Sequence, residues 1–332
     1  MEMRRLGTNG PLVPEIGLGC SAMSGTYGPA RDADGIATIR AALDAGLTLI
    51  DTADFYGTGH NEWLIRQALR PGDRDNAVLS VKFGGLRGPD GNWTGFDARP
   101  AHVKSALAYS LQRLGTDHID IYRPARLDPE VPIEETIGAI AEMVQAGYVR
   151  SIGLSEVGAH TIRRAHAVHP ISDLQIEYSL FSRGIEVGIL DTCRELGIGV
   201  TAYGVLSHGL LTGTYQPAAD GSDPRSHLPR FDQGNVAANL ALVDKLRDIA
   251  DSHTVTVAQL AIAWVLAQGR KHGDVAALIG ARRPQRITEA LPAAELILNE
   301  QDLAAIEQAV PASAVSGGRY AAPQLAQLDS ER

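Results

Sequence analysis

The sequence predicts a (β/α)8 barrel, in which a ring of parallel strands is surrounded by helices. Short apolar, β-branched segments recur along the chain, and helical patterns lie between most of them. Alternating strands and helices imply a parallel sheet, and near-continuous apolar strands imply burial on both faces. Eight such repeats within 332 residues favour a closed barrel over an open sheet, so we expect a single domain over residues 1–332.

The eight expected strands are apolar runs that turn polar at their ends. They cover residues 15–20, 47–53, 77–83, 118–125, 149–156, 173–180, 199–206 and 275–282. Ahead of the first run, residues 4–14 (RRLGTNGPLVP) contain an Asn-Gly turn signal, which predicts a β-hairpin capping the bottom of the barrel. No GxGxxG follows the first strand, which argues against the doubly wound dinucleotide-binding fold.

Helix signals lie between the strands. Residues 33–46, 99–115 and 133–148 place apolar side chains at helical spacing. Pro100 stands at a first-turn position, where its missing N–H is not needed, and Gly115 provides a left-handed stop. These patterns predict helices on the outside of the barrel.

Composition and charge place the chain among soluble globular proteins. Hydrophobic residues make up 44% of the sequence, and the net charge of −9 argues against a nucleic-acid or anionic-membrane partner. Cys20 and Cys193 lie in no metal-ligand spacing, which predicts neither a disulfide framework nor a metal site and fits a reducing compartment. No run reaches the roughly 18 apolar residues of a membrane span, and the N-terminus has no signal-peptide pattern, so we expect a cytoplasmic protein.

In barrels of this kind the reactive groups lie at the C-terminal ends of the strands. The second strand ends in Asp51, with Tyr56 five residues further on, and the third ends in Lys82. A buried ammonium needs a partner, and Asp51 is the neighbouring carboxylate. A close lysine lowers the pKa of a phenol from about 10, which makes Tyr56 a workable proton donor for carbonyl reduction. The alternative is an ordinary buried Asp–Lys pair beside a core tyrosine.

Six segments, in this order along the chain, resemble the aldo-keto reductases: GLGCSAMSGTYG, LIDTADFYG, SVKFG, IGLSE, LQIEYSLF and IGARRPQRITEAL. The resemblance covers nearly the whole chain and looks most like the branch that includes bacterial reductases and the potassium-channel β subunits. It implies a nicotinamide cofactor laid across the barrel mouth without a Rossmann motif. It also implies that Asp51, Tyr56 and Lys82 are three members of the catalytic tetrad of the family, acting on a small carbonyl substrate.

The resemblance further implies where the cofactor is bound. Ser155 and Gln175 match the residues that hold the nicotinamide carboxamide, and Tyr203 matches the aromatic that stacks on the ring. Arginines after the last strand match the region around the adenosine 2′-phosphate, and because guanidinium groups suit phosphate, NADPH is favoured over NADH. The expected cofactor residues are Gly19, Cys20, Ser155, Glu156, Gln175, Tyr203, Gly204, Leu206, Ser207, Gly209, Leu210, Gly280, Arg282, Arg283, Arg286 and Glu289.

The fourth strand departs from the family. It ends in Arg123-Pro124-Ala125-Arg126, and Ala125 stands where the family usually has a histidine facing the substrate carbonyl. Three interpretations are open. In the first, Tyr56 is the sole acid, and an arginine or an ordered water orients the carbonyl. In the second, the missing imidazole makes room for an unusual substrate. In the third, the protein is an NADPH-binding regulatory or redox-sensing protein with little turnover. We favour the first, an NADP-dependent carbonyl reductase, because the other three tetrad residues are present.

Two long loops are expected beside the substrate. Residues 84–100 set aromatic side chains among glycines, which suits a pocket wall that closes over an organic substrate. Residues 214–235 are too long for a simple connection and are expected to form an active-site loop. The predicted pocket residues are Tyr27, Phe55, Trp93, Arg123, Ala125 and Arg126.

Overall fold

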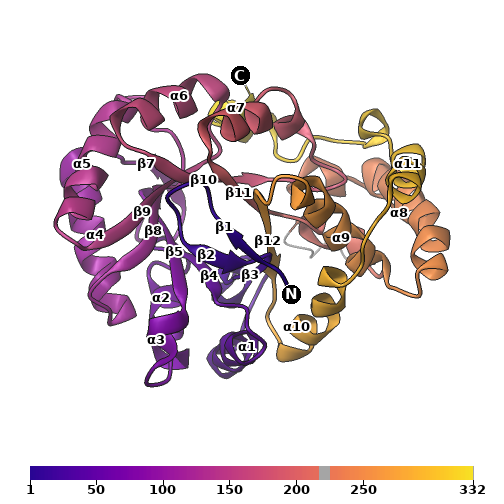
Figure 1. The fold of residues 1–332 in the computed structure, drawn as a ribbon, viewed down its shortest axis with the longest axis horizontal. Coiled ribbons are helices and arrows are strands. Elements are labelled where there is room, and N and C mark those ends of the chain that lie inside the picture. The colour runs from indigo at the N-terminus through magenta and orange to yellow at the C-terminus, as the bar shows by residue number, and fades with distance from the viewer. Residues whose placement is uncertain (217–224, 332) are drawn as a thin grey trace.

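A computed structural model, which describes residues 1–216 and 225–331, confirms the closed (β/α)8 barrel (Figure 1). Eight parallel strands pair in the order β3-β4-β5-β8-β9-β10-β11-β12, and β12 closes the ring on β3. The strands are β3 (Ile16–Gly19), β4 (Leu49–Ala53), β5 (Val78–Phe83), β8 (Ile119–Pro124), β9 (Val149–Ser155), β10 (Ile171–Glu177), β11 (Gly199–Tyr203) and β12 (Val275–Gly280).

Helices surround the barrel (Figure 1). They are α1 (Asp32–Asp44), α2 (His60–Ala68), α3 (Asp73–Asn76), α4 (Pro100–Leu114), α5 (Ile133–Gln145), α6 (Ala159–Val168), α7 (Ile189–Leu196), α8 (Gln233–Ser252), α9 (Val257–Arg270), α10 (Pro284–Ala290), α11 (Glu300–Ala309) and α12 (Ala322–Leu325). The predicted helices are confirmed as α1, α4 and α5. Pro100 begins α4 and Gly115, at φ 68°, ends it in the left-handed conformation, as the sequence pattern predicts.

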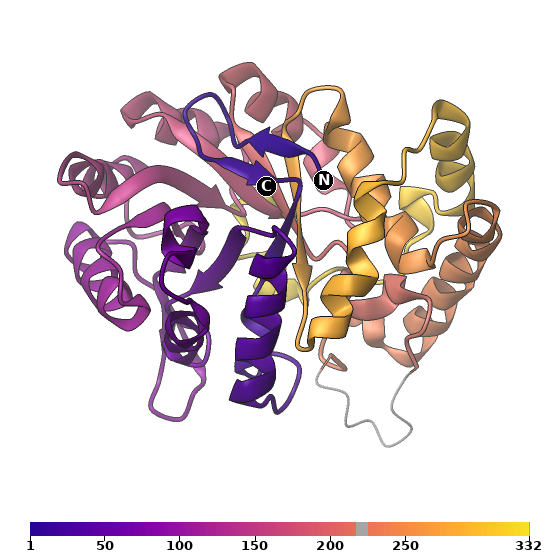
Figure 2. The same ribbon diagram turned by 60° about the horizontal axis from the view of Figure 1, so that its bottom comes forward.

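The predicted N-terminal hairpin is confirmed. Strands β1 (Met3–Arg5) and β2 (Leu12–Pro14) pair antiparallel, joined by residues 6–11, and Figure 2 shows the hairpin lying across one end of the barrel. Leu6 and Val13 pack in one buried cluster with Leu49, Ile121 and Leu278 from three barrel strands. The hairpin therefore closes the N-terminal end of the barrel with apolar side chains.

Every residue of β4 and of β10 is buried, as expected for strands covered on both faces. These strands nevertheless carry Asp51, Asp173, Gln175 and Glu177. A buried polar group is costly unless it is hydrogen-bonded, so each needs a partner inside the protein. Those partners define the candidate site.

The loop predicted at residues 84–100 contains a second hairpin, formed by β6 (Gly85–Arg87) and β7 (Trp93–Phe96). The loop predicted at 214–235 includes residues 217–224, which lie outside the described residues. After α11, residues 310–331 return to the strand ends: the N–H of Ser330 donates to the carbonyl oxygen of Glu156 at 3.3 Å, and that of Gly158 donates to Asp329 Oδ2 at 2.8 Å. We call residues 310–331 the C-terminal segment.

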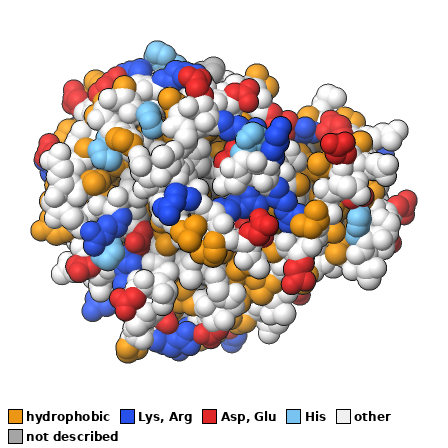
Figure 3. Space-filling model, in the orientation of Figure 1, with side chains coloured by type: hydrophobic (Ala, Val, Ile, Leu, Met, Phe, Trp, Pro, Cys, Tyr) orange, Lys and Arg blue, Asp and Glu red, His pale blue; other side chains and the backbone are white. Residues whose placement is uncertain are grey.

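Acidic and basic side chains are interspersed over the face turned to the viewer in Figure 1, as the space-filling view shows (Figure 3). Within the described residues, no single helix is long and apolar enough to cross a membrane. Helices α8 and α9 together are long and apolar enough, but the pair is bent by 86° between them.

Candidate active site

Asp51, Tyr56 and Lys82 meet at the C-terminal end of the barrel. Asp51 is in β4 and Lys82 is in the neighbouring β5, and each is only 4% exposed. Lys82 Nζ lies 2.6 Å from Asp51 Oδ1 and 5.1 Å from the ring centroid of Tyr56, which follows β4 in a turn. The structure thus brings together the three side chains that the sequence analysis singled out as catalytic.

The second carboxylate oxygen of Asp51 is also engaged. It accepts hydrogen bonds from Ser80 Oγ at 2.8 Å and from the side-chain amide of Gln175 at 2.7 Å. Gln175, expected to hold the nicotinamide carboxamide, therefore donates a hydrogen bond from its amide nitrogen to Asp51. Four buried side chains from β4, β5 and β10 therefore position one another through direct hydrogen bonds.

Burial raises the pKa of Tyr56, and the charge of Asp51 raises it further. Burial also lowers the pKa of Lys82, although the charge of Asp51 opposes this. The charges of Arg126 and, more weakly, Arg123 oppose the rise in the pKa of Tyr56. The role of Lys82 in lowering the Tyr56 pKa stays a prediction. Tyr56 is therefore a neutral phenol that can donate a proton at neutral pH.

Arg123 does not lie in the pocket wall, which corrects the sequence analysis. Its side chain is fully buried inside the barrel, where Nη1 lies 3.0 Å from Asp173 Oδ2 and Nη2 donates to Ser80 Oγ at 2.9 Å. Gly153 makes room for this pair, because a Cβ there would come within 3.1 Å of the guanidinium carbon and 2.7 Å of Asp173 Oδ1. Arg123 is thus part of the barrel interior and does not reach a substrate at the mouth.

Ala125 and Arg126 follow the end of β8. Ala125 is 2% exposed, and its N–H donates to the carbonyl oxygen of Phe83 at 2.8 Å. Arg126 is half-buried, and its Nη1 donates to the carbonyl oxygen of Ala125 at 2.7 Å and to Ser155 Oγ at 3.5 Å. The charge of Arg126 acts on Tyr56, on Tyr203 and on Glu156, so its guanidinium is close to all three side chains at the mouth.

Aromatic side chains form a continuous wall beside Tyr56. Phe55 lies edge-on to Tyr56 with ring centroids 5.0 Å apart, and Trp93 follows at 5.3 Å from Phe55. Phe96 continues the series at 5.4 Å from Trp93. Gly85 permits this packing, since a Cβ there would lie 2.6 Å from the Trp93 ring and 2.7 Å from that of Phe55. The β6–β7 hairpin is therefore packed onto the catalytic loop through its aromatic residues.

Glu156 follows β9 with a left-handed φ of 53° and is fully buried. Its Oε1 accepts hydrogen bonds from Tyr203 Oη at 2.7 Å, from the N–H of Glu177 at 2.9 Å and from Arg319 at 2.8 Å. Burial alone would raise the pKa of Glu156, but the hydrogen bond and charge of Arg319 lower it to about 2. Ser155 and Tyr203, which flank this carboxylate, lie where the sequence analysis expected the nicotinamide ring.

The turn expected to hold the pyrophosphate follows β11 and has an unusual backbone. Ser207, His208 and Gly209 have φ of 46°, 54° and 102°, so three consecutive residues are left-handed. Tyr27 Oη lies 2.8 Å from His208 Nδ1, whereas His208 Nε2 is buried and has no hydrogen-bond partner in the described part of the chain. Burial lowers the pKa of His208, so the ring is neutral. The remaining expected residues of this turn are Gly204, Leu206 and Leu210, and Leu210 is buried.

Three exposed arginines lie after β12, where the sequence analysis expected the 2′-phosphate. Gly280 ends β12, and Arg282, Arg283 and Arg286 follow it with exposed side chains. Arg282 Nη1 donates to the carbonyl oxygen of Tyr27 at 3.2 Å, and Arg286 Nη1 lies 2.5 Å from Glu289 Oε2. These residues form a basic rim on the side of the mouth where Tyr27 lies.

Gly19 and Cys20, also expected near the cofactor, end β3 beside the catalytic strand. The N–H of Cys20 donates to the carbonyl oxygen of Asp51 at 3.0 Å, and burial raises the pKa of its thiol. Cys20 therefore packs as a neutral side chain against the catalytic strand.

The sequence model of the Aldo/keto reductase family matches residues 15–311. The chain belongs to this family. Members of the family reduce carbonyl compounds with a nicotinamide cofactor, and an eight-stranded barrel with a Tyr–Lys–Asp cluster at its mouth suits that chemistry.

Full-length relatives support the assignment. The chain is 41% identical to a protein named "Probable aldo-keto reductase 1" of Glycine max over 95% of this chain and 91% of the relative. It is 38% identical to "Aldo-keto reductase yakc [NADP(+)]" of Schizosaccharomyces pombe over 96% and 94% of the two chains. Among solved structures, the glycerol dehydrogenase AKR11B4 from Gluconobacter oxydans matches with a TM-score of 0.83 and 31% identity, over 92% of this chain and 94% of that one.

In this aldo/keto reductase the C-terminal segment supplies residues that the sequence analysis missed. Arg319 donates to both oxygens of Glu156, at 2.8 and 2.6 Å, and Tyr320 Oη lies 3.1 Å from Tyr203 Oη. A further missed residue, Arg230, donates to Ser182 Oγ at 2.8 Å beside Glu177. The only signal for these arginines was that two carboxylates at neighbouring strand ends, Glu156 and Glu177, required cations from elsewhere in the chain.

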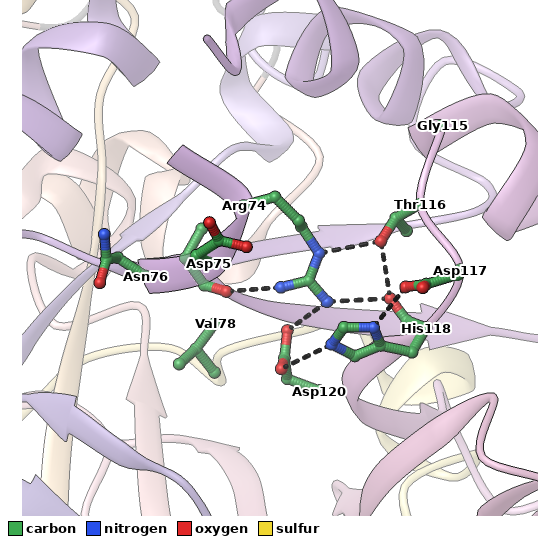
Figure 4. A pocket seen from close by; sticks show the side chains of 10 residues that line it. Arg74, Asp75, Asn76, Val78, Gly115, Thr116, Asp117, His118 and Asp120 are labelled. Atoms are coloured by element: carbon green, nitrogen blue, oxygen red, sulfur yellow. Dashed lines mark hydrogen bonds and ion pairs between the residues drawn. The ribbon is translucent and has the colours of Figure 1, made fainter. Parts of the chain in front are cut away.

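A pocket of about 640 Å³ lies at the opposite end of the barrel from Tyr56, between α3 and the start of β8 (Figure 4). Its charged groups bind one another: Arg74 lies 2.9 Å from Asp120 and donates to Thr116 Oγ1 at 2.9 Å, and His118 lies 2.6 Å from Asp117. In barrel enzymes this end serves stability and the other end serves chemistry. We therefore place the active site of this aldo/keto reductase at the mouth.

Proposed function

We propose that this aldo/keto reductase is an NADPH-dependent oxidoreductase that reduces aldehyde or ketone groups to alcohols. The observation that carries the proposal is the cluster in which Tyr56 meets the Lys82–Asp51 ion pair at the barrel mouth. Tyr56 is the proton donor, since burial keeps its phenol protonated. Asp51 holds the Lys82 ammonium beside the Tyr56 ring, and Ser80 and Gln175 hold Asp51.

Three features of the mouth fit a phosphorylated dinucleotide. His208 Nε2 is a buried polar atom without a partner in the described chain, in the turn proposed to bind the pyrophosphate. Tyr203 presents an aromatic ring at the end of β11, and Arg282, Arg283 and Arg286 are exposed where a 2′-phosphate would bind. The yeast relative carries NADP(+) in its name, which supports NADPH over NADH. When bound, the cofactor supplies the hydride.

The aromatic wall fits a small organic carbonyl compound as substrate. Phe55 packs edge-on against Tyr56, and Trp93 packs against Phe55 with the Arg87 guanidinium over its ring. Trp93 is still 44% exposed, so part of its ring is available to contact a ligand. The name of the structural relative, glycerol dehydrogenase, describes interconversion of an alcohol and a carbonyl compound, which supports the same reaction class here.

Cys20 and Cys193 are free and buried, which fits the cytoplasm as the site of action.

The first experiment is a single-turnover measurement of NADPH oxidation by reactive aldehydes, with NADH in parallel. We expect the wild-type protein to oxidise NADPH and to prefer it to NADH. Tight NADPH binding without oxidation by any aldehyde would instead favour an NADPH-binding regulatory or redox-sensing protein, the function that the absent histidine at Ala125 would suit.

The second experiment tests Tyr56→Phe, which removes the phenolic hydroxyl and with it the acidic proton. A general acid contributes typically about 10²–10⁴-fold, so we expect at least a 100-fold loss of carbonyl reduction, with NADPH affinity near wild type. Tyr148→Phe is the matched control, because Tyr148 is 48% exposed and follows α5 on the outside of the barrel. Retained turnover in Tyr56→Phe would remove Tyr56 as the acid.

A further inference from the structure

Two arginines three residues apart have opposite environments. Arg123 is fully buried and ion-paired with Asp173, whereas Arg126 has no carboxylate within ion-pair distance in residues 1–216 and 225–331. Charged side chains that are withdrawn from water are normally paired, and the Arg126 side chain is half-buried. Arg126 therefore holds a positive charge at the mouth that the described protein does not neutralise by direct contact.

Arg126 follows the end of β8 at the barrel mouth, and part of its guanidinium is not used by the protein. Its Nη1 is used by the carbonyl oxygen of Ala125 and by Ser155, but Nε and Nη2 have no hydrogen-bond partner among the described residues. Both nitrogens remain accessible to solvent, since neither is a buried atom. Among the cations around Tyr56, Arg126 has the largest effect in lowering the pKa of that phenol. The guanidinium is thus close to the proton donor and keeps two N–H-bearing nitrogens free.

We propose that the Arg126 guanidinium performs the carbonyl-binding role that Ala125 cannot: it donates hydrogen bonds to the substrate carbonyl oxygen and directs that oxygen toward Tyr56. This inference rests on the proposed function and assigns a further catalytic residue to it. In the reaction, the carbonyl carbon gains a hydride as NADPH is oxidised to NADP+, and the oxygen gains the proton of Tyr56 Oη. The phenolate regains a proton from water, and Arg126 neither gains nor loses one, since a guanidinium stays protonated in proteins.

The assignment explains how the reaction can proceed without an imidazole. Positioned donors aimed at an oxygen that becomes negative are among the largest single contributions to catalysis, and a guanidinium supplies them with a fixed charge. The same charge opposes the effect of burial on the pKa of Tyr56 and so favours proton release when it is needed. Unlike a histidine, Arg126 adds no ionisation near pH 6.5 to the rate profile.

The test compares Arg126→Ala and Arg126→Lys with the wild type, with Arg163→Met as the control on the outer helix α6. In single-turnover oxidation of bound NADPH by an aldehyde, we expect Arg126→Ala to lose about 10²–10³-fold in rate and Arg126→Lys to lose less. NADPH affinity, measured by fluorescence, should stay near wild type in both. Added guanidinium ion should restore part of the rate of Arg126→Ala, and so should Ala125→His in the same chain.

A readout that does not depend on turnover is the affinity of the NADP+ complex for a carbonyl compound that NADPH does not reduce, such as benzamide, measured by protein fluorescence. A hydrogen bond from a charged donor to the amide oxygen is lost in Arg126→Ala, so we expect benzamide to bind about tenfold more weakly or worse to that variant. Arg163→Met should bind it as the wild type does, and equal affinity in Arg126→Ala and wild type would overturn the assignment. An unchanged rate, or a loss of NADPH affinity as large as the loss of rate, would overturn the assignment. If the wild type itself fails to oxidise NADPH while Arg126→Ala still weakens benzamide binding, the proposed function fails but the contact between Arg126 and a carbonyl oxygen stands.

Discussion

Two buried charge clusters lie on either side of the mouth, and they are built differently. The barrel cluster consists of Asp51, Ser80, Lys82, Arg123 and Asp173, all from strands β4, β5, β8 and β10. The C-terminal cluster joins Glu156 and Glu177, at the ends of β9 and β10, to Arg319 and Arg230 from distant segments. Strand register alone assembles the first cluster, whereas the Arg319–Glu156 pair of the second exists only when the C-terminal segment is docked.

This difference shows which charge is available to a ligand. In the barrel cluster Lys82 pairs with Asp51 and Arg123 with Asp173. In the C-terminal cluster Arg319 pairs with Glu156 at 2.6 Å, and Arg230 lies 3.4 Å from Glu177. Arg126 belongs to neither pairing, although its charge also acts on Glu156. Because the cations of both clusters are paired with carboxylates, Arg126 is the cation that we propose to orient the substrate.

The largest expected effect is that of breaking the barrel cluster. Asp173→Asn keeps the side-chain shape but removes the charge that faces Arg123, and both side chains are fully buried. Breaking a buried ion pair by removing one partner typically costs about 3–5 kcal/mol, so we expect a loss of that order in the free energy of unfolding, measured in urea.

The control for this variant is Asp244→Asn, which removes an exposed carboxylate from a surface pair with Arg247. It should leave the free energy of unfolding near that of the wild type. If Asp173→Asn lowered the free energy of unfolding no more than the control does, Arg123 would not be an uncompensated buried charge in that variant.

The next effect is expected at the C-terminal cluster. Arg319→Met removes two hydrogen bonds to Glu156, but Tyr203 Oη, the N–H of Glu177 and Ser330 Oγ still donate to it. Because Glu156 keeps these donors, we expect a smaller loss than at the barrel cluster, on the order of 2 kcal/mol in the free energy of unfolding at neutral pH.

The pH dependence of this loss follows from the pKa of Glu156, which is lowered from 4.5 to about 2, chiefly by Arg319 and to a smaller extent by Arg126 and Ser330. A lowered carboxyl pKa stabilises the folded state above pH 4.5, and this stabilisation disappears as the pH falls toward 2. The difference between wild type and Arg319→Met should therefore shrink over that interval, as urea unfolding at several pH values would show. A difference that is constant with pH would mean that Arg319 acts through packing alone.

The same contrast explains what the sequence can and cannot predict. The eight strands, the outer helices, the hairpin and the meeting of Asp51 with Lys82 depend on local periodicity and neighbouring strand ends, so they are predictable. Arg123 was predictable in principle, since it shares the two-residue alternation of β8 with Ile121, which faces the barrel interior. Placing it at the mouth ignored that alternation.

The C-terminal cluster is harder to predict for a physical reason. Glu156 and Arg319 are 163 residues apart, and Arg319 lies in a segment without helical or strand periodicity. Only the docked fold brings such residues together.

The pKa of Tyr56 is equally hard to predict. It depends on the competition between burial, Asp51 and Arg126, and residue spacing carries no information about which of them prevails.

The smallest effect is expected on the surface and isolates the role of burial. Arg163 binds Glu195 through two hydrogen bonds of 2.7 and 2.6 Å, nearly the geometry of Arg319 with Glu156, but its side chain is 47% exposed and that of Glu195 is 60% exposed. Exposed pairs are screened by water and restrict two long side chains, so Arg163→Met should leave the free energy of unfolding without measurable change. A double-mutant cycle with Glu195→Gln measures the pair directly. If that coupling matched the one between Arg319 and Glu156, geometry would outweigh burial in this protein, and the contrast between the docked C-terminal cluster and the exposed surface would need a different cause.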